Sequence, residues 1–302
     1  MKLVIGTRGS KLALAQVDFV SMLLKERFPD LEFEKRIIKT TGDKISDAPL
    51  ARIGGKGLFV KEIDEAVARG DVDFAVHSMK DVPTEVLEEL EIACVPERED
   101  ARDVLISRDK LTLETLPRGA VIGTSSLRRK AEVLNYRGDL QVKDIRGNVD
   151  TRLRKLSSRE YDAIIMAKAG LKRLDLEEVI SQELPLDVFL PSIGQGAIAV
   201  VARRDFEGEY LSAINHIASM HRIQAERALL KRLGGGCQVP IGAMTQINGK
   251  LFLTAAVFSP NGDRKIEAIA DGKAEDAEEI GVTAAEELLR KGADEILEEV
   301  YG

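Results

Sequence analysis

The sequence predicts an α/β protein with two successive α/β units and a smaller α+β domain after them. Three observations support this fold class. Apolar β-rich runs alternate with helical patterns over the first two thirds of the chain, a charged and turn-prone passage interrupts the alternation, and the pattern after residue 240 changes to alternating strands and one helix. At 302 residues, the chain is long enough for two or three units of roughly 100 to 150 residues each.

The first unit is expected to combine four short strands with two helices. Apolar residues at spacings of three and four indicate the helices. Strands are predicted over 3–5, 36–38, 74–76 and 92–95, and helices over 11–28 and 58–69. The charged passage at 96–100 then predicts a hinge.

The second unit repeats this alternation. Its strands are predicted over 104–106, 121–123, 141–145 and 163–166, and its helices over 127–136 and 149–156. A further strand at 197–202 comes so late that we expect it to return to the first unit. A long helix over 212–233 follows and ends at the glycines of residues 234–236.

The last part of the chain predicts a small α+β domain. Two alternating strands, 251–258 and 265–270, flank the turn at 259–262, and an amphipathic helix is expected over 274–290. The expected domains are therefore residues 1–97 with 195–214, residues 98–194, and residues 215–302.

Composition excludes several function classes. The net charge of -7 and the aromatic share of 4% argue against a nucleic-acid partner. No apolar run approaches the ~18 residues of a membrane span, and no secretion signal is evident, so a cytoplasmic protein is expected. The three histidines and two cysteines form no close metal-ligand pattern, so no metal is expected.

Cys237 directly follows three glycines, which places its thiol on a predicted loop where another molecule can reach the sulfur. Positive surroundings would lower the pKa of such a thiol and favour the nucleophilic thiolate. The alternative is a small buried apolar residue.

Basic residues gather at predicted strand ends and glycine turns. Loops at the carboxyl ends of strands form the ligand crevice in open α/β sheets, so these cations suit a ligand with several anionic groups. The alternative is solvated charges and helix caps. Asp81 is an acid among these cations, suited to stabilising a cationic intermediate or moving a proton, or alternatively to capping the turn that follows. The basic residues are Arg8, Lys56, Lys80, Arg128, Arg129, Arg146 and Arg152.

The chain resembles the porphobilinogen deaminase family over almost its whole length. The motifs that carry the resemblance occur in family order. They are TRGSKLA at 7–13, GGKGLF at 54–59, AVHSMKDVP at 75–83, GTSSLRR at 123–129, RGN at 146–148 with Arg152, AGLKR at 169–173, PSIGQG at 191–196, and Glu226-Arg227 followed by GGCQVP at 235–240.

The resemblance implies an enzyme, hydroxymethylbilane synthase, that joins four porphobilinogen molecules head to tail, releases ammonia at each step and frees hydroxymethylbilane by hydrolysis. Cys237 would hold a dipyrromethane cofactor through a thioether, as the primer for chain growth. Each pyrrole carries an acetate and a propionate, which matches the arginine-rich strand ends. The implied fold has two lobes like those of periplasmic binding proteins, a cleft between them and a small third domain, in a monomer.

The resemblance also implies roles for single residues. Asp81 would be catalytic, stabilising the azafulvene cation formed as ammonia leaves. Besides Cys237, the cofactor-binding residues would be Ser78, Lys80, Thr124, Ser126, Arg128, Arg129, Arg146 and Gly147. The substrate-binding residues would be Arg8, Ser10, Lys56, Phe59, Arg152 and Gln195, with Phe59 against a pyrrole ring and Gln195 near the interdomain hinge.

Two positions depart from the family pattern. Arg52 stands where lysine is expected, and Lys168 stands where a smaller apolar residue is common; the sequence leaves open whether Lys168 faces the cleft. Two other functions were weighed. A two-lobed anion-binding module would not need the glycine-presented cysteine, and a cysteine hydrolase with His77 as base shows no evident orienting partner.

Overall fold

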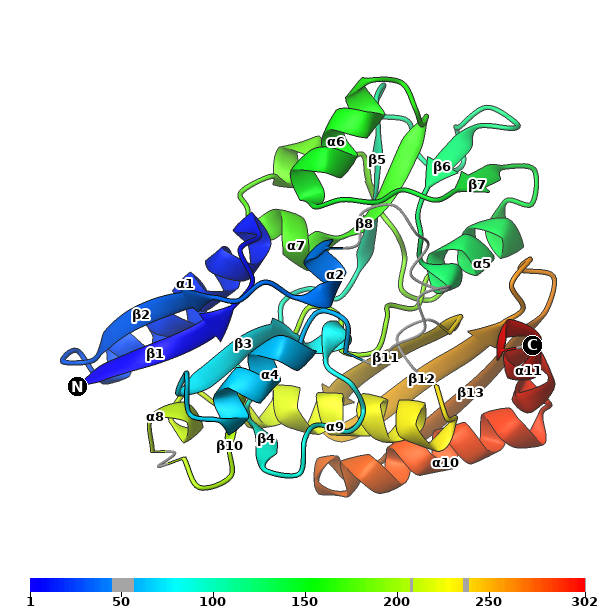
Figure 1. The fold of residues 1–302 in the computed structure, drawn as a ribbon. Helices are drawn as coiled ribbons and strands as arrows, with labels where there is room; N and C mark the ends of the chain where they lie inside the picture. Colours follow the sequence, from blue (N-terminus) through cyan, green and yellow to red (C-terminus); the bar gives the residue numbers. More distant parts are fainter. Residues whose placement is uncertain (45–56, 207–208, 236–238, 302) are drawn as a thin grey trace. The chain divides into compact units, whose positions relative to one another are not determined.

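The computed structural model describes residues 1–44, 57–206, 209–235 and 239–301 (Figure 1). The chain divides into two compact units. Unit 1 comprises Met1–Glu99 and Gly196–His221, and unit 2 comprises Asp100–Gln195 and Arg222–Gly302. In the described part of the chain, no helix combines the length and apolar character that crossing a membrane requires.

Unit 1 is built on a five-stranded sheet in the order β2-β1-β3-β10-β4. Strands β1, β2 and β3 are parallel, whereas β10 is antiparallel to both of its neighbours. The late strand thus returns to the first sheet, as the sequence predicts. The strands are β1 (Lys2–Thr7), β2 (Glu32–Ile37), β3 (Phe74–Ser78), β4 (Leu90–Cys94) and β10 (Ile198–Arg203).

Helix α1 (Lys11–Arg27) packs against this sheet through an apolar face. It buries Val17, Val20 and Leu24 in a core that includes Leu3 and Phe74. The remaining helical segments are α2 (Thr41–Lys44), α4 (Lys61–Ala68), the 3₁₀ turn η1 (Met79–Asp81) and α8 (Glu209–Ser212).

Unit 2 contains a second five-stranded sheet, in the order β7-β6-β8-β5-β9. Strands β6, β7 and β8 are parallel, and β5 is antiparallel to β8 and β9. Its strands are β5 (Asp103–Ser107), β6 (Val121–Gly123), β7 (Gln141–Lys143), β8 (Ala163–Ala167) and β9 (Gln182–Glu183). Its helical segments are α5 (Leu127–Tyr136), α6 (Val149–Ser157), α7 (Lys168–Lys172) and η2 (Glu177–Val179).

Unit 2 also holds the α+β part of the chain. Helix α10 (Ala277–Arg290) packs along an antiparallel three-stranded sheet, and their apolar faces share one core with α9 (Figure 1). The strands are β11 (Ile241–Asn248), β12 (Lys250–Phe258) and β13 (Lys265–Gly272). Helix α9 (Ile217–Arg232) begins in unit 1 and continues in unit 2 from Arg222. The other helical segments are η3 (Ala274–Asp276) and α11 (Ala293–Tyr301).

The structure confirms the α/β class and the smaller α+β part, with differences in single elements. The single helix predicted over 212–233 is wrong, because α8 ends at Ser212 and α9 begins at Ile217. The break is held by tertiary contacts, since the backbone N–H of Val95 donates to Asn215 Oδ1 at 2.9 Å. Strand β11 and helix α11 were not predicted.

The boundaries of the compact units lie close to two predicted domain boundaries. The chain leaves unit 1 after Glu99 and re-enters it at Gly196, beside the expected boundaries at 97/98 and 194/195. Within unit 2, a buried apolar cluster of Ala131, Ala256 and Phe258 joins α5 to β12. The finer division into three domains stays a prediction.

Candidate functional site

In unit 1, the predicted site residues follow the carboxyl ends of the parallel strands. Arg8 comes directly after β1, and Ser78 to Asp81 end β3 and form η1. Parallel strands bring their carboxyl ends to one edge of a sheet, which places these residues at the edge where ligands bind in such folds.

Arg8 already has a carboxylate partner within the chain. Its Nη2 lies 2.5 Å and its Nε 3.1 Å from Asp43 Oδ1, and its guanidinium carbon lies 4.4 Å from the centre of the Phe59 ring. Burial works against the ionised form of Asp43, but hydrogen bonds from Arg8 and Thr40 outweigh it and lower the pKa of that carboxyl. Two predicted substrate-binding residues, Arg8 and Phe59, therefore lie in contact.

The hydroxyl groups of Ser10 and Ser78, two residues of the predicted site, accept hydrogen bonds from helix α1. Ser10 is the N-cap of α1, where its Oγ accepts the backbone N–H of Ala13 at 3.2 Å. Ser78 Oγ accepts a hydrogen bond from Nε2 of the buried Gln16 at 2.8 Å. Both hydroxyls are thus fixed in place from the side of helix α1.

Asp81 closes the turn that follows β3. Its side chain is half-buried, and within the described residues its carboxylate takes part in no hydrogen bond or ion pair. Lys80, next to it, is half-buried as well. The carboxylate of Asp81 therefore keeps its acceptor capacity for another molecule.

In unit 2, two loops carry the predicted site. Ser126 is the N-cap of α5, and its own N–H donates to Thr124 Oγ1 at 3.2 Å. Ser125 ties this loop to the loop after β7, because its Oγ donates to the carbonyl of Ile145 at 2.8 Å and accepts the N–H of Ile145 at 3.1 Å. Ser125 therefore joins the loop before α5 to the loop that contains Arg146.

Arg128 is enclosed by internal partners. Its guanidinium lies 2.8 Å from Asp103 and 2.7 Å from Glu132, and it donates to the carbonyl of Leu190 at 2.7 Å. The side chain is only 3% exposed. Burial raises the pKa of Glu132 to about 8, helped by the charge of Asp103 and opposed by Arg128. The predicted role of Arg128 in binding the cofactor stays a prediction, and the structure gives this arginine a structural role.

Arg129 and Gln195 converge on the same carboxylate. Arg129 donates to Asp103 Oδ1 from Nε at 3.1 Å and from Nη2 at 2.7 Å, and to Gln195 Oε1 at 3.2 Å. Gln195 Nε2 donates to Asp103 at 2.8 Å and to the carbonyl of Ala101 at 2.7 Å. Burial disfavours the ionised form of Asp103, but Arg128 and Arg129 overcome it and hold the pKa of Asp103 well below its usual range.

Arg152 has a different environment from Arg128. Its Nε donates to the carbonyl of Gly147 at 2.8 Å, and it forms no ion pair with a carboxylate in the described chain. Burial, together with the positive charges of Arg129 and Arg146, lowers the pKa of Arg152 to about 10. Gly147 adopts a φ of 113°, a left-handed conformation that favours glycine. The guanidinium groups of Arg129, Arg146 and Arg152 thus lie near one another, and no carboxylate of the described chain forms an ion pair with Arg152.

Lys168 and His77, whose roles the sequence does not decide, both have partners within the chain. Lys168 pairs with Glu183 and lies 3.1 Å from Asp100, so its ammonium is engaged within unit 2. His77 Nε2 lies 3.0 Å from Asp64 Oδ1 in a buried pair. The orienting partner that the sequence did not show for His77 is therefore Asp64.

The remaining predicted positions lie outside the described residues. These are Lys56, Cys237 and the variant position Arg52. The helix before Cys237 ends as predicted, with Gly234 at a φ of 66° and the N–H of Gly235 donating to the carbonyl of Leu230 at 3.1 Å.

Two family descriptions match most of the chain. Residues 3–209 match the family described as "Porphobilinogen deaminase, dipyromethane cofactor binding domain", and residues 220–290 match "Porphobilinogen deaminase, C-terminal domain". The chain belongs to the porphobilinogen deaminase family.

Curated porphobilinogen deaminases match nearly the full chain. The protein from Geobacter sulfurreducens is 52% identical over 99% of this chain and 95% of its own length. The one from Shouchella clausii is 50% identical over 99% of this chain and 97% of its own length. Among solved structures, the methionine binding protein MetQ aligns over 75% of this chain and 90% of its own, with 11% identity and a TM-score of 0.42.

The arginines of unit 2 fit the dipyrromethane cofactor of the porphobilinogen deaminase family. A dipyrromethane built from porphobilinogen carries acetate and propionate groups, which are the partners that guanidinium groups bind best. Arg129, Arg146 and Arg152 offer a concentration of positive charge, and Arg152 lacks a carboxylate partner among the described residues.

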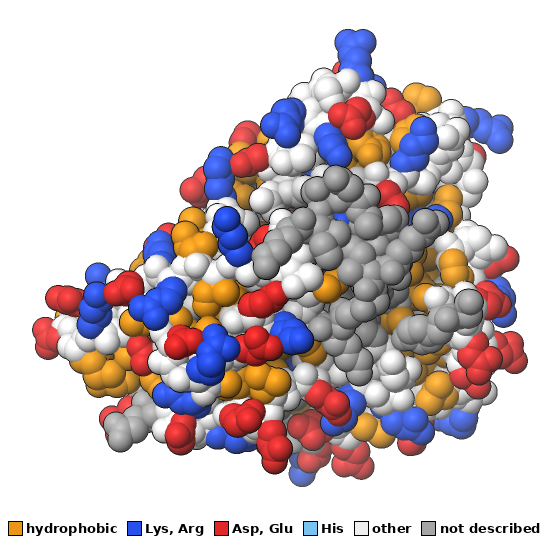
Figure 2. All heavy atoms as spheres, in the orientation of Figure 1, with side chains coloured by type: hydrophobic (Ala, Val, Ile, Leu, Met, Phe, Trp, Pro, Cys, Tyr) orange, Lys and Arg blue, Asp and Glu red, His pale blue; other side chains and the backbone are white. Residues whose placement is uncertain are grey.

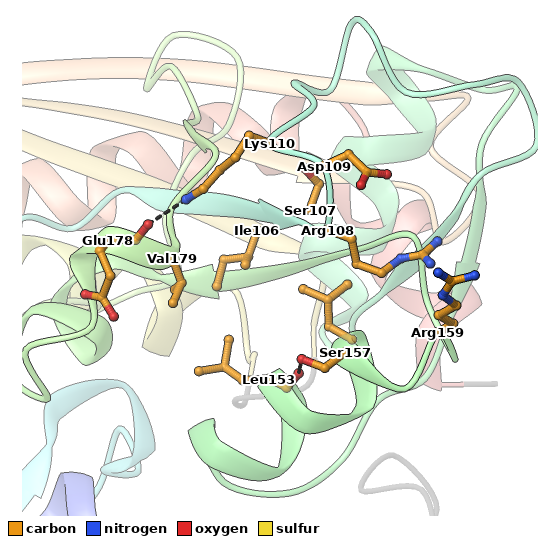
Figure 3. A pocket seen from close by; sticks show the side chains of 11 residues that line it. Ile106, Ser107, Arg108, Asp109, Lys110, Leu153, Ser157, Arg159, Glu178 and Val179 are labelled. Atoms are coloured by element: carbon orange, nitrogen blue, oxygen red, sulfur yellow. Dashed lines mark hydrogen bonds between the residues drawn. The ribbon is translucent and has the colours of Figure 1, made fainter.

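A separate pocket in unit 2 holds none of the predicted site residues. Its volume is about 700 Å³, and Ile106, Leu153 and Val179 lie along it together with Arg108 and Lys110 (Figure 3). Basic and acidic side chains are interspersed on the face of the molecule in Figure 2.

Sequence reasoning missed three residues that bind the predicted site residues. Asp103, Asp43 and Gln16 each bind a predicted site residue. One signal existed for Gln16, which is polar but lies on the apolar face of a predicted helix, three residues after Ala13 and four before Val20. Asp103 directly precedes the strand predicted over 104–106, and a carboxylate that is buried at such a position requires a partner.

Proposed function

We propose that this chain is a porphobilinogen deaminase, a transferase also called hydroxymethylbilane synthase, that acts in tetrapyrrole biosynthesis. It condenses four porphobilinogen molecules head to tail on a dipyrromethane primer held by Cys237, then releases hydroxymethylbilane by hydrolysis. In each condensation, the carbon–nitrogen bond of the aminomethyl group breaks and a carbon–carbon bond to the preceding pyrrole forms. The proton lost from that pyrrole balances the amine that leaves as ammonia.

The observation that carries this proposal is the arginine cluster of unit 2. Arg129, Arg146 and Arg152 concentrate positive charge where Arg152 has no carboxylate partner in the described chain. Such an arrangement costs stability unless an external anion compensates it. The dipyrromethane supplies both the carboxylates and the pyrrole end on which the product grows.

Asp81 is the residue we assign to catalysis. Its carboxylate is half-buried and forms no hydrogen bond or ion pair among the described residues, which suits it to accept pyrrole N–H groups. A fixed negative charge at that position stabilises the cation that develops as ammonia departs, and the same carboxylate can take up a proton.

The other residues bind carboxylates or position the rings. In unit 1, these are Arg8, Ser10, Lys56, Phe59, Ser78 and Lys80. In unit 2, they are Thr124, Ser126, Arg128, Arg129, Arg146, Gly147, Arg152 and Gln195. We further propose the three domains and the cleft expected from the sequence, and a cytoplasmic monomer. Porphobilinogen is the only partner that the proposal requires.

Intact mass spectrometry of the purified protein tests the proposal. The expected mass exceeds that of the chain by two pyrrole units, and Cys237→Ser should lack this adduct. Asp81→Asn should keep the fold, and its release of ammonia from porphobilinogen should fall by about 100-fold or more, because a charged group at the reacting centre is lost.

Arg154→Gln serves as the matched control, since Arg154 is exposed on helix α6 and its side chain forms no hydrogen bond or ion pair among the described residues. It should match the wild type in adduct and in turnover. An active wild-type protein of unmodified mass, or an adduct on Cys237→Ser, would refute the attachment site. Wild-type turnover by Asp81→Asn would refute the role of Asp81.

A further inference from the structure

We propose that Asp103 is a positioning residue for this reaction, because its carboxylate fixes the guanidinium of Arg129 and the amide of Gln195 together. The inference rests on the proposed function. Asp103 itself is buried at the start of β5 and is assigned no contact with cofactor or substrate.

The geometry centres three predicted site residues on this one carboxylate. Oδ1 accepts hydrogen bonds from Arg129 Nε, Arg129 Nη2 and Gln195 Nε2, at 3.1, 2.7 and 2.8 Å. Oδ2 lies 2.8 Å from a guanidinium nitrogen of Arg128.

The guanidinium of Arg129 already uses most of its hydrogen-bond donors within the protein. Of the five N–H groups of its guanidinium, two donate to Asp103, one to Gln195 and one to the carbonyl of Ile165. This leaves one N–H, on Nη1, for a ligand carboxylate. A guanidinium fixed by four hydrogen bonds offers that donor in one direction, whereas a free one would lose rotamer entropy on binding.

Asp103 also connects Arg129 to two of the three places where the chain passes from one unit to the other. Gln195 is the last residue of unit 2 before the chain returns to unit 1, and Ala101 lies just inside unit 2 after the first crossing. Gln195 donates to the carbonyl of Ala101 at 2.7 Å and to Asp103 at 2.8 Å. Gln195 therefore joins the segments at residues 101 and 195 directly, and the Asp103 carboxylate joins both Gln195 and Arg129.

Loss of this carboxylate should affect turnover more than substrate affinity. The primer is covalently attached, so a displaced Arg129 changes where its growing end lies, and it does not change the encounter with porphobilinogen. Substituting a residue that orients a binding group without touching the ligand usually lowers activity about 10- to 100-fold.

The test compares Asp103→Asn with the wild type as purified holoenzymes. Asn keeps the shape and one acceptor oxygen but removes the charge that holds two guanidinium groups. We expect kcat for ammonia release to fall about 10- to 100-fold while KM for porphobilinogen stays within about threefold. Both constants are measured on the folded, adduct-bearing fraction, selected by intact mass. Asp103→Glu, which keeps the charge but moves it by one methylene, should recover part of kcat.

Glu132→Gln is the matched control from the same buried network. Glu132 contacts Arg128 but neither Arg129 nor Gln195, and burial raises its pKa to about 8, so Gln resembles its protonated form. Its kcat should stay within about threefold of the wild type, a smaller change than loss of an orienting group causes.

Each outcome decides the inference. A folded Asp103→Asn with wild-type kcat overturns it, and so does an equal loss in Glu132→Gln. If neither Asp103 variant folds, the carboxylate is purely structural and the inference is withdrawn. A wild-type protein without adduct or ammonia release would instead overturn the proposed function, so the two failures are distinguishable.

Discussion

At the scale of single residues, the predicted arginines differ in how the fold compensates their charge. Arg128 is surrounded by Asp103, Glu132 and a backbone carbonyl, whereas Arg152 is near two other arginines. A buried, compensated arginine supports the fold, and an uncompensated one is a candidate for ligand binding. The motifs that contain Arg128 and Arg152 do not show this difference, because in the sequence each is simply an arginine near a predicted strand end.

Replacing Arg152 by Gln should stabilise the cofactor-free protein. The pKa of Arg152 is lowered to about 10 in the folded state, so at pH 7 keeping it charged costs stability that a neutral side chain does not lose. We expect the free energy of unfolding to rise by about 0.5–2 kcal/mol. The measurement is chemical denaturation in a Cys237→Ser background, where no cofactor can be tethered.

In the protein with Cys237 intact, the same Arg152→Gln change should reduce the fraction that carries the adduct. Arg154→Gln, on the exposed side of α6, should leave both quantities within experimental error. A cofactor-free Arg152→Gln protein less stable than its parent would contradict the electrostatic explanation.

The sequence predicted the chemical types of the site residues but not their internal partners. Arg8 and Asp43 are 35 residues apart, and Arg129 and Asp103 are 26 apart. Such pairs depend on which loops the sheet order brings together, and no local spacing encodes that. Lys56 and Cys237 lie outside the described residues and stay predictions.

At the scale of elements, local patterns predicted most helices and strands of both sheets. Helix α5 has the predicted bounds, and Ser126 caps it. Strand β11 was missed because its burial follows no regular alternation, and its pairing with β12 defines it. The helix break after Ser212 depends on a contact with Val95, which a local pattern cannot show.

Gly281 allows helices α9 and α10 to pack closely. A Cβ at this position would lie 2.2 Å from the carbonyl oxygen of Ala225 and 2.8 Å from Cβ of Ala228. Gly281→Ala gains about 1 kcal/mol in helix propensity, but we expect the overpacking to outweigh it. The net loss in the free energy of unfolding should be about 1–3 kcal/mol, measured by urea denaturation.

Thr283→Ala is the control in the same helix. Thr283 is exposed, so this change should be neutral or stabilising by a few tenths of a kcal/mol. If Gly281→Ala is as stable as Thr283→Ala, the two helices can separate at little cost and the close approach is unimportant.

At the scale of the whole molecule, the two five-stranded sheets share one topology. In each sheet, three parallel strands are followed by an antiparallel strand and an edge strand. The antiparallel strand is the first one after the chain enters the unit, β5 in unit 2 and β10 on the return to unit 1. Alternation of strands and helices predicted the class, and the return of β10 was predicted from its late position.

Phe258 should couple the second five-stranded sheet to the three-stranded one. It is 1% exposed and packs with Ala131 of α5 and Leu190. Phe258→Ala should destabilise unit 2 by about 3–5 kcal/mol. Hydrogen exchange should accelerate in both α5 and β12 and remain unchanged in β1 and β3.

Phe252→Ala tests whether that effect is specific. Phe252 lies on the same strand but is 41% exposed, so its loss should change stability by about 0.5 kcal/mol or less. Faster exchange confined to β11–β13 in Phe258→Ala would show that the two sheets of unit 2 unfold independently.

The position of β10 has a consequence for folding during synthesis. Strand β10 lies between β3 and β4, so the first sheet stays divided until residue 203 has left the ribosome. By then, residues 100–195 of unit 2 have already emerged. Until β10 is synthesised, β3 and β4 therefore lack the strand that pairs with both of them. Their unpaired edges can form hydrogen bonds with strands of other chains during this interval, which favours aggregation.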